Sequence, residues 1–336
     1  MKSKLLVLLL FAVSAFAGGS SHEDGHEDTF DPSAMIIHHI GDSHEWHLFD
    51  FHGESYVIPL PIILYSEKNG LDVFLSTNFV GKAHGPAKYK DYILDHEHIT
   101  MADGSHVLDL SITKNVASML FAVVLLFVVM FSVRAGYSKN KGKAPKGIQS
   151  FFEPLILFIR DEVAVPNLGH NAKKFLPFLL TIFFFILFNN LLGLIPTGAN
   201  ASGNIGFTMV LAVIVALVTN FSGKSAYWKH IFAPPGVPLL LYPIIVPIEI
   251  LGILTKPFAL MIRLFANITA GHIIILSLFS FIFVFKSWQV GIVSAAFVTL
   301  MTFMELFVAF LQAFIFTMLA ALFIGTAAND HHEEHH

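Results

Sequence analysis

The chain has 336 residues, of which 55% are hydrophobic and only 13% are charged, and its formal net charge is −4. Several apolar runs reach the roughly 20 residues that a helix needs to cross a bilayer, which excludes an ordinary soluble protein and indicates a polytopic membrane protein. The absence of Cys excludes disulfides, thiol catalysis and thiolate metal sites.

Residues 1–17 have the pattern of a signal peptide. Two lysines begin the segment, an apolar run follows, and residues 15–17 (Ala-Phe-Ala) have the small-x-small form of a cleavage site. A short membrane anchor is the alternative interpretation. Cleavage after residue 17 would place the next segment outside the cytoplasm.

Residues 18–110 form a polar region that contains eleven of the eighteen His and no run long enough to span a bilayer. Three runs, at 54–63, 71–79 and 107–112, favour β-strands separated by Gly and Pro. Imidazole suits zinc or copper, so a His cluster here is a candidate metal site, although a solvated His-rich segment is the plainer interpretation. The cluster consists of His38, His39, His44 and His47.

The first membrane span is predicted at residues 116–133. Five Lys and Arg residues follow between positions 134 and 146, which indicates the cytoplasmic side, because cytoplasmic loops are rich in basic residues. Residues 148–160 then combine aromatic and charged faces, a pattern typical of a helix that lies in the membrane interface.

Two shorter spans are predicted at residues 175–195 and 205–221, joined by a loop without Lys or Arg. Lys224 and Lys229 follow the second of them and again indicate the cytoplasmic side. This charge pattern predicts an extracytoplasmic N-terminus after signal cleavage and a cytoplasmic C-terminus.

Two long apolar segments remain, at residues 238–285 and 288–328. As single helices they would measure about 70 and 60 Å, whereas the hydrocarbon core is only about 30 Å thick. We therefore expect a strongly tilted antiparallel hairpin beside upright helices. The predicted fold is an all-α membrane domain over residues 111–330, with a polar tail at 331–336 and a small, β-containing N-terminal region.

Arg263 lies deep within the first long segment. A guanidinium stays protonated in any protein environment, and placing it near a bilayer centre costs about 2.5 to 17 kcal/mol, depending on the reference. Glu249, Lys256 and Arg263 recur every seven residues and share one stripe of the helix, which Asn267 extends. A chain that carries this cost is expected to need the positive charge for its task.

The returning segment carries Glu305 and Gln312, seven residues apart on one helical face. If Gln312 lies level with Arg263, Glu305 comes to the depth of His272 on the outer side, while Glu249 lies on the cytoplasmic side. The sequence thus predicts two polar patches on opposite sides of one cation, without a continuous pore.

Each of these residues also has a structural interpretation. Intramembrane amides often only hold helices together, Lys256 can snorkel beside Pro257, and Arg263 can belong to an internal ion pair. Together the residues favour ion transfer. A proton-coupled secondary transporter and a structural membrane scaffold are the alternative functions, although the chain contains no repeat of the kind that many transporters have.

One short segment suggests a nucleotide-binding enzyme, but it lacks a glycine that the motif requires, so this function is disfavoured. Residues 223–225 read Gly-Lys-Ser, like the end of a P-loop, but position 218 is Val where that motif needs Gly.

Two motifs in the long segments resemble a known family. Residues 256–272, from Lys-Pro through Arg-Leu-Phe-Ala-Asn to Gly-His, closely resemble the signature of subunit a of F-type ATP synthases, and residues 311–316 resemble that family's last-helix motif. Residues 189–196 (Asn-Asn-Leu-Leu-Gly-Leu-Ile-Pro) fit as well. The resemblance covers roughly residues 115–330 and does not extend to the N-terminal region.

The resemblance implies a role for each intramembrane polar residue. Arg263 matches the arginine that faces the carboxylates of the rotating c-ring, and Asn267 and Gln312 match polar residues near it. Glu249 matches a carboxylate of the cytoplasmic path. His272 and Glu305 match a pair on the outer path, exchanged relative to many bacterial members and arranged as in mitochondrial ones.

The resemblance also implies the setting. The chain would be a stator ion-channel subunit of a bacterial inner membrane that binds no nucleotide, cofactor or nucleic acid. Its partners would be the c-ring, the subunit b stalk, the other ATP synthase subunits and lipid. Two offset half-channels would deliver protons to and from the c-ring carboxylates and couple proton flow to rotation and ATP synthesis. The choice between H⁺ and Na⁺ stays open.

Overall fold

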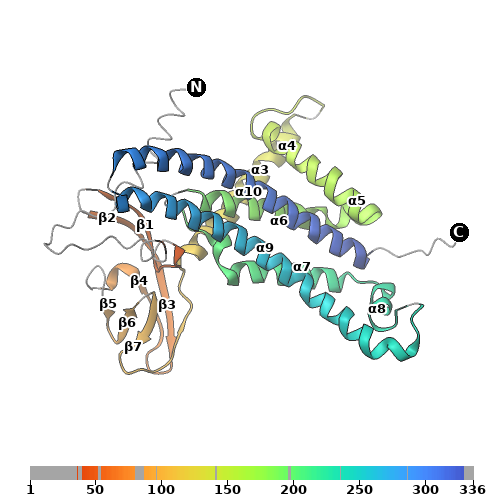
Figure 1. The fold of residues 1–336 in the computed structure, drawn as a ribbon, viewed down its shortest axis with the longest axis horizontal. Helices are drawn as coiled ribbons and strands as arrows, with labels where there is room; N and C mark the ends of the chain where they lie inside the picture. Colours follow the sequence, from red (N-terminus) through yellow and green to blue (C-terminus); the bar gives the residue numbers. More distant parts are fainter. Residues whose placement is uncertain are drawn as a thin grey trace. The chain divides into compact units, whose positions relative to one another are not determined.

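The computed structural model describes residues 36, 40–51, 54–79, 87–95, 97–140, 142–195, 198–234, 236–285 and 287–328 (Figure 1). The predicted signal peptide, His38, His39 and the polar tail lie outside these residues. The chain divides into two compact units: the first comprises residues 1–121, 192–201 and 275–299, and the second comprises the rest.

The region before the first membrane helix is built from short antiparallel strands. β1 pairs with β2, β3 lies between β4 and β8, and β6 lies between β5 and β7. The strands are β1 (Glu45–Phe51), β2 (Glu54–Pro59), β3 (Pro61–Ser66), β4 (Gly70–Leu75), β5 (Ala87–Tyr89), β6 (Tyr92–Asp95), β7 (His98–Met101) and β8 (Val107–Asp109).

A small aromatic and aliphatic core joins the two three-stranded sheets. Ile62, Leu64 and Tyr92 are fully buried, and the ring of Phe74 lies 4.7 Å from that of Tyr89. The expected β structure is therefore confirmed. The predicted run at 54–63 is two strands, because the chain turns at Leu60, whose backbone N–H donates to the Ser76 hydroxyl.

The strands β1 and β5–β7 were not predicted. They are three to seven residues long. Polar residues interrupt their apolar alternation, so period-two patterning carries little signal over such lengths. Pairing with neighbouring strands supplies the order that the local sequence does not indicate.

Beyond residue 113 the described chain is helical. The helices are α3 (Lys114–Lys139), α4 (Ile148–Phe158), α5 (Val165–Leu168), α6 (Ala172–Gly193), α7 (Ile205–Phe221), α8 (Ser225–Phe232), α9 (Tyr242–Phe285) and α10 (Trp288–Ala328). Within the described residues, four helices are long and apolar enough to cross a membrane, or five if α7 and α8, which meet at 102°, count as one broken span. This confirms a polytopic, mostly helical membrane protein.

The predicted interfacial helix at 148–160 begins as expected at Ile148 but does not end near residue 160. A π-helical turn, Ile159–Ala164, carries it on into α5, and Gly169 (φ 54°) then ends it. The ring of Phe152 lies 5.7 Å from that of Phe184 on α6, and the ring of Phe158 lies 5.3 Å from that of Phe314 on α10. The apolar face of α4 therefore packs against protein.

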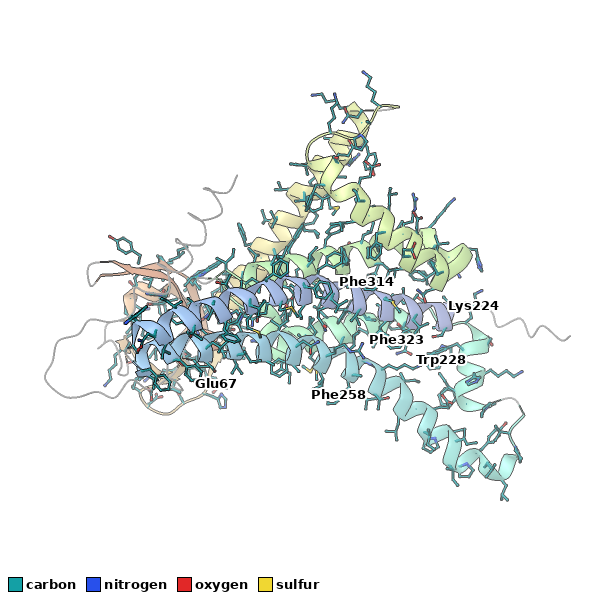
Figure 2. The ribbon with its side chains drawn as sticks, turned by 45° about the horizontal axis from the view of Figure 1, so that its top comes forward. Glu67, Lys224, Trp228, Phe258, Phe314 and Phe323 are labelled. Atoms are coloured by element: carbon teal, nitrogen blue, oxygen red, sulfur yellow. The ribbon has the colours of Figure 1, made fainter. Side chains whose placement is uncertain are left out.

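The two long helices α9 and α10 have 44 and 41 residues, and both views show them side by side (Figures 1 and 2). Each is about twice the length that the hydrocarbon core accommodates upright, so tilt or bending follows from length. Pro243 lies in the first turn of α9, where a missing N–H is tolerated, whereas Pro247 and Pro257 lie within the helix.

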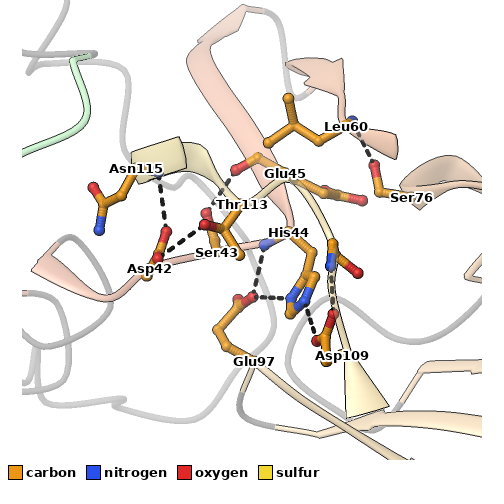
Figure 3. Close-up of polar contacts among 11 residues, drawn as sticks. Asp42, Ser43, His44, Glu45, Leu60, Ser76, Glu97, Asp109, Thr113 and Asn115 are labelled. Carbon is orange, nitrogen blue, oxygen red and sulfur yellow. Dashed lines mark hydrogen bonds and ion pairs between the residues drawn. The ribbon is translucent and has the colours of Figure 1, made fainter. Parts of the chain in front are cut away.

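An ion cluster around a buried histidine stabilises the strand region (Figure 3). The His44 ring is 3% exposed, and its Nε2 lies 2.9 Å from Asp109 Oδ2 while its Nδ1 lies 3.5 Å from Glu97 Oε2. Burial disfavours the charged ring, but hydrogen bonds and the charges of both carboxylates outweigh it and raise the pKa of His44 to about 9. Burial raises the pKa of Asp109, but hydrogen bonds from His44 and Ser111 outweigh this and lower it to about 2.

Two of the four histidines of the candidate metal cluster, His44 and His47, lie in the described part of the chain. His44 is buried between its carboxylates, whereas His47 is exposed on β1. Among the described residues no group of three or more His, Cys, Asp or Glu has the arrangement of a metal site.

Replacing His44 with Gln should destabilise the strand region in a pH-dependent manner. The His44 cation contributes fully below its ordinary pKa of 6.5, and the contribution disappears as pH rises through about 9. Near pH 6 we expect the free energy of local opening to fall by at most about 3 kcal/mol, since one pKa unit corresponds to about 1.4 kcal/mol. Hydrogen exchange over β7 in the full chain in nanodiscs measures this.

The exposed His47→Gln is the matched control, for which little change is expected. If His44→Gln destabilised the region equally at about pH 6 and above pH 9, the role of the charged ring would be contradicted.

Candidate functional site

Arg263 lies at the middle of α9 and is exposed on its surface. Leu264, the next residue, is fully buried, so the two lie on different faces of the helix. Among the described residues, no Asp or Glu lies within ion-pair distance of Arg263. The guanidinium therefore faces outward from a long apolar helix without a carboxylate of its own chain.

One turn beyond Arg263, a hydrogen bond joins α9 to α10. The side-chain amide of Asn267 donates to Gln312 Oε1 at 3.0 Å. Gln312 is 2% exposed, and its Nε2 has no hydrogen-bond partner within the described part of the chain. A buried donor of this kind is costly unless something satisfies it.

A second polar contact joins the same two helices. His272 Nδ1 lies 3.9 Å from Glu305 Oε1, and both side chains are largely covered. Gly271 provides the room for this arrangement, because a Cβ at that position would overlap the Glu305 carboxylate. The acid and the imidazole are thus held against each other inside the helix pair.

These contacts establish the antiparallel register of the hairpin. Lys256 Nζ lies 5.7 Å from the centroid of the Phe323 ring, on the opposite side of Arg263 from His272. From Lys256 through Asn267 to His272 on α9, the partners on α10 run backward from Phe323 to Gln312 to Glu305. Figure 2 labels Phe323 and Phe314 on α10 and Phe258 on α9.

Glu249 is not part of these contacts. It is half-buried on α9, fourteen residues before Arg263 and therefore about 21 Å from it along the axis. Tyr227 of α8, whose hydroxyl donates to Asn220 Oδ1 at 3.1 Å, lies within electrostatic reach of Glu249. The predicted cytoplasmic residue is thus separate from the predicted outer pair.

Asn190 supports the site and was not singled out by residue chemistry. Its side-chain amide donates to the backbone carbonyl of Ala309 at 3.1 Å, and its Oδ1 accepts from the Ser202 hydroxyl at 2.6 Å. Ala309 lies between Glu305 and Gln312, so Asn190 holds α10 between its two polar residues. The sequence feature that could have indicated this role is the pair of adjacent amides, Asn189 and Asn190, within an apolar span.

Replacing Asn190 with Leu should destabilise the helix packing by about 1 kcal/mol, since an interhelical hydrogen bond in a membrane is worth roughly that much and Ser202 loses its acceptor. Thermal unfolding of the purified chain in one detergent measures the effect. The neighbouring Asn189 is the matched control, because its amide donates only to Phe185 of its own helix. Equal effects of Asn190→Leu and Asn189→Leu would contradict a special role for the contact with α10.

The N-terminal strands and the helices match different families. Residues 35–118 match a family described as Domain of unknown function (DUF8433). Residues 116–325 match the family described as ATP synthase A chain. The boundary between the two matches falls at the start of α3.

Curated relatives match two thirds of the chain or more. The chain is 53% identical over 236 residues to "ATP synthase subunit a 2" of Chlorobaculum tepidum and 48% identical over 236 residues to "ATP synthase subunit a" of Chloroherpeton thalassium. These matches cover 68% of the chain and 66% and 70% of the relatives, so the chain spans about two thirds of their length. "ATP synthase subunit a" of Anaeromyxobacter sp. is 37% identical over 95% of the chain and 76% of its own length. The chain belongs to the ATP synthase A chain family.

Proposed function

We propose that the chain is the stator proton channel of a rotary ATP synthase, in which Arg263 is the fixed charge between two offset half-channels. The observation that carries the proposal is the exposed guanidinium at the middle of α9, which has no carboxylate partner in the described part of its own chain. A permanent cation in an apolar surface is stabilised best by an acidic group on a partner. Carboxylates of a rotating c-ring supply such a group.

The charge of Arg263 determines the protonation of each passing carboxylate. A carboxylate that faces lipid is held neutral, because an isolated charge there is too costly. Beside Arg263 the ionised form is favoured, so the proton leaves into one half-channel. A proton from the other half-channel neutralises the carboxylate before it returns to lipid. The guanidinium cannot relay protons, so it separates the two paths.

The other polar residues divide between the two paths. His272 and Glu305, 3.9 Å apart, form the outer path as a coupled acid–imidazole pair. Glu249, about 21 Å along α9 on the other side of Arg263, belongs to the cytoplasmic path. Asn267 and Gln312 position α9 and α10 beside the cation. A membrane potential drives the cycle with about 2.3 kcal/mol per charge per 100 mV.

The same proposal specifies the membrane, the orientation of the chain, its partners and the transported ion. The chain is a multi-pass protein of the ATP synthase complex, and its membrane is the bacterial inner membrane. The N-terminal region is extracytoplasmic and the C-terminus cytoplasmic, in agreement with the basic residues after α3 and α7. Its direct partners are the c-ring and the subunit b stalk. The transported ion is the proton, and pumping by inverted vesicles in sodium-free buffer distinguishes it from Na⁺.

Arg263→Ala and Arg263→Lys should both abolish ATP-driven proton pumping by inverted vesicles. Ala removes the charge, and a buried Lys can lose its proton, so neither provides a permanent cation. Fluorescence quenching of a pH-sensitive dye measures pumping. Lys256→Gln, on the same stripe of α9, is the matched control and should pump normally. Full coupling in the Arg263→Lys variant would refute the requirement for a permanent charge.

Exchanging His272 and Glu305 should retain more proton-pumping activity than replacing either residue with Ala. The double variant His272→Glu with Glu305→His keeps one acid and one imidazole in contact, whereas His272→Ala or Glu305→Ala leaves the partner unsupported. Proton pumping and its pH dependence measure the difference. If the exchanged variant lost as much activity as the single variants, the two residues would not act as a unit.

A further inference from the structure

The sheet β4–β3–β8 has an apolar face turned away from the core of its region. Ile62, Leu64 and Phe74 point into the core, and the alternate residues point outward. Those outward positions are exposed, Leu71 to 64% and Val73 to 62%. The most exposed members of this outer face are Tyr65, Leu71, Val73, Leu75, Leu108 and Leu110.

Strand register makes these side chains neighbours. Tyr65 lies opposite Leu71 on one side and opposite Leu108 on the other. Ile63 lies opposite Val73, and its carbonyl accepts from the Leu110 N–H at 2.9 Å. The outer face is therefore one continuous apolar surface across three strands. Contiguous exposed surfaces of this kind mark interaction sites.

The charged side chains of the same strands lie on the inner face of the sheet. Asp72 on β4 accepts hydrogen bonds from Lys90 Nζ and the Tyr92 hydroxyl, both at 2.8 Å. Asp109 on β8 is engaged by His44. The outer face therefore lacks the polar residues that the water-facing side of a one-sided sheet usually carries. Exposure of the outer face to water is therefore unfavourable.

Chain connection places this face next to a membrane helix. The Ile112 N–H donates to the Pro61 carbonyl at 3.1 Å, and α3 begins two residues later at Lys114. Five residues lie between Leu108 and Lys114, which limits the distance between these two to at most about 20 Å. In the same compact unit, Leu120 and Phe121 of α3 expose their apolar side chains as well.

The start of α3 is also held to the strand region by hydrogen bonds (Figure 3). Asp42 accepts from the Asn115 N–H at 3.0 Å and from the Thr113 hydroxyl at 2.9 Å, and the Ser43 carbonyl accepts from the Lys114 N–H at 2.8 Å. These groups cap the first turn of the helix. The sheet cannot move far from the point where α3 enters the bilayer.

We propose that the outer face of the sheet β4–β3–β8 lies on the bilayer, in the leaflet where α3 begins. Tyr and Leu side chains suit the interface between headgroups and acyl chains. The face lies close along the chain to a helix that is long and apolar enough to cross a membrane, which favours lipid over a protein partner. The inference does not depend on the proton path.

Because the chain has no Cys, single thiols report this contact directly. Val73→Cys, on the outer face, and Thr100→Cys, at an exposed position of β7, each carry a nitroxide label on the full chain in phosphatidylcholine vesicles. Collision rates with oxygen, which concentrates in lipid, and with a water-soluble nickel chelate are compared. We expect the oxygen-to-nickel ratio to be severalfold higher at position 73 than at position 100.

Adding Leu71→Asp beside the label at position 73 should bring its ratio down to that of position 100. The mobility of the label at position 100, measured with and without Leu71→Asp, checks that the region stays folded. Equal ratios at the two positions without Leu71→Asp would overturn the proposal. Protection of position 73 only in the assembled ATP synthase, or only at high protein-to-lipid ratio, would also overturn it, because a protein would then cover the face.

Discussion

A guanidinium that keeps its proton in every environment constrains everything around it. Arg263 is exposed at the middle of a 44-residue apolar helix, and in the described part of the chain no acidic side chain neutralises it. An acidic group on a partner would lower the cost of that charge, which is the reason that we propose such a partner. The length of α9 adds a second constraint, because a helix of 44 residues is about twice what the hydrocarbon core accommodates upright.

The returning helix α10 makes polar contacts at three levels, in addition to its apolar packing. Asn190 holds it at Ala309, Gln312 accepts from Asn267, and Glu305 contacts His272. Hydrophobic burial cannot orient helices against each other in lipid, because lipid tails are as apolar as the side chains. Hydrogen bonds and close packing at small residues such as Gly271 therefore decide which face of α10 meets α9.

How far the sequence predicts this structure depends on the range of the interactions. The helices follow from hydropathy, and the similar depth of His272 and Glu305 follows from spacing and helical rise, whereas their pairing is implied only by the family resemblance. The role of Asn190 does not, because its partners Ala309 and Ser202 lie far away in sequence and only the folded chain brings them together. The sequence does not predict the extension of α4 into α5 for a similar reason. The charged residues near position 160 indicate the end of a helix, but packing against α6 and α10 lets the helix continue.

The strand region illustrates a different limit. Alternation in Leu71, Val73 and Leu75 predicts a strand, yet both sets of alternate positions contain apolar residues, so pattern alone cannot say which face is buried. The core cluster with Tyr92 resolves it, since Leu64 and Phe74 pack there. Because one face of the sheet packs into the core, the other apolar face either contacts an apolar surface or stays exposed to water, which lowers the stability of the region. The first membrane helix begins at Lys114, five residues after β8 ends at Asp109, so the nearest apolar phase is the bilayer that the helix itself enters.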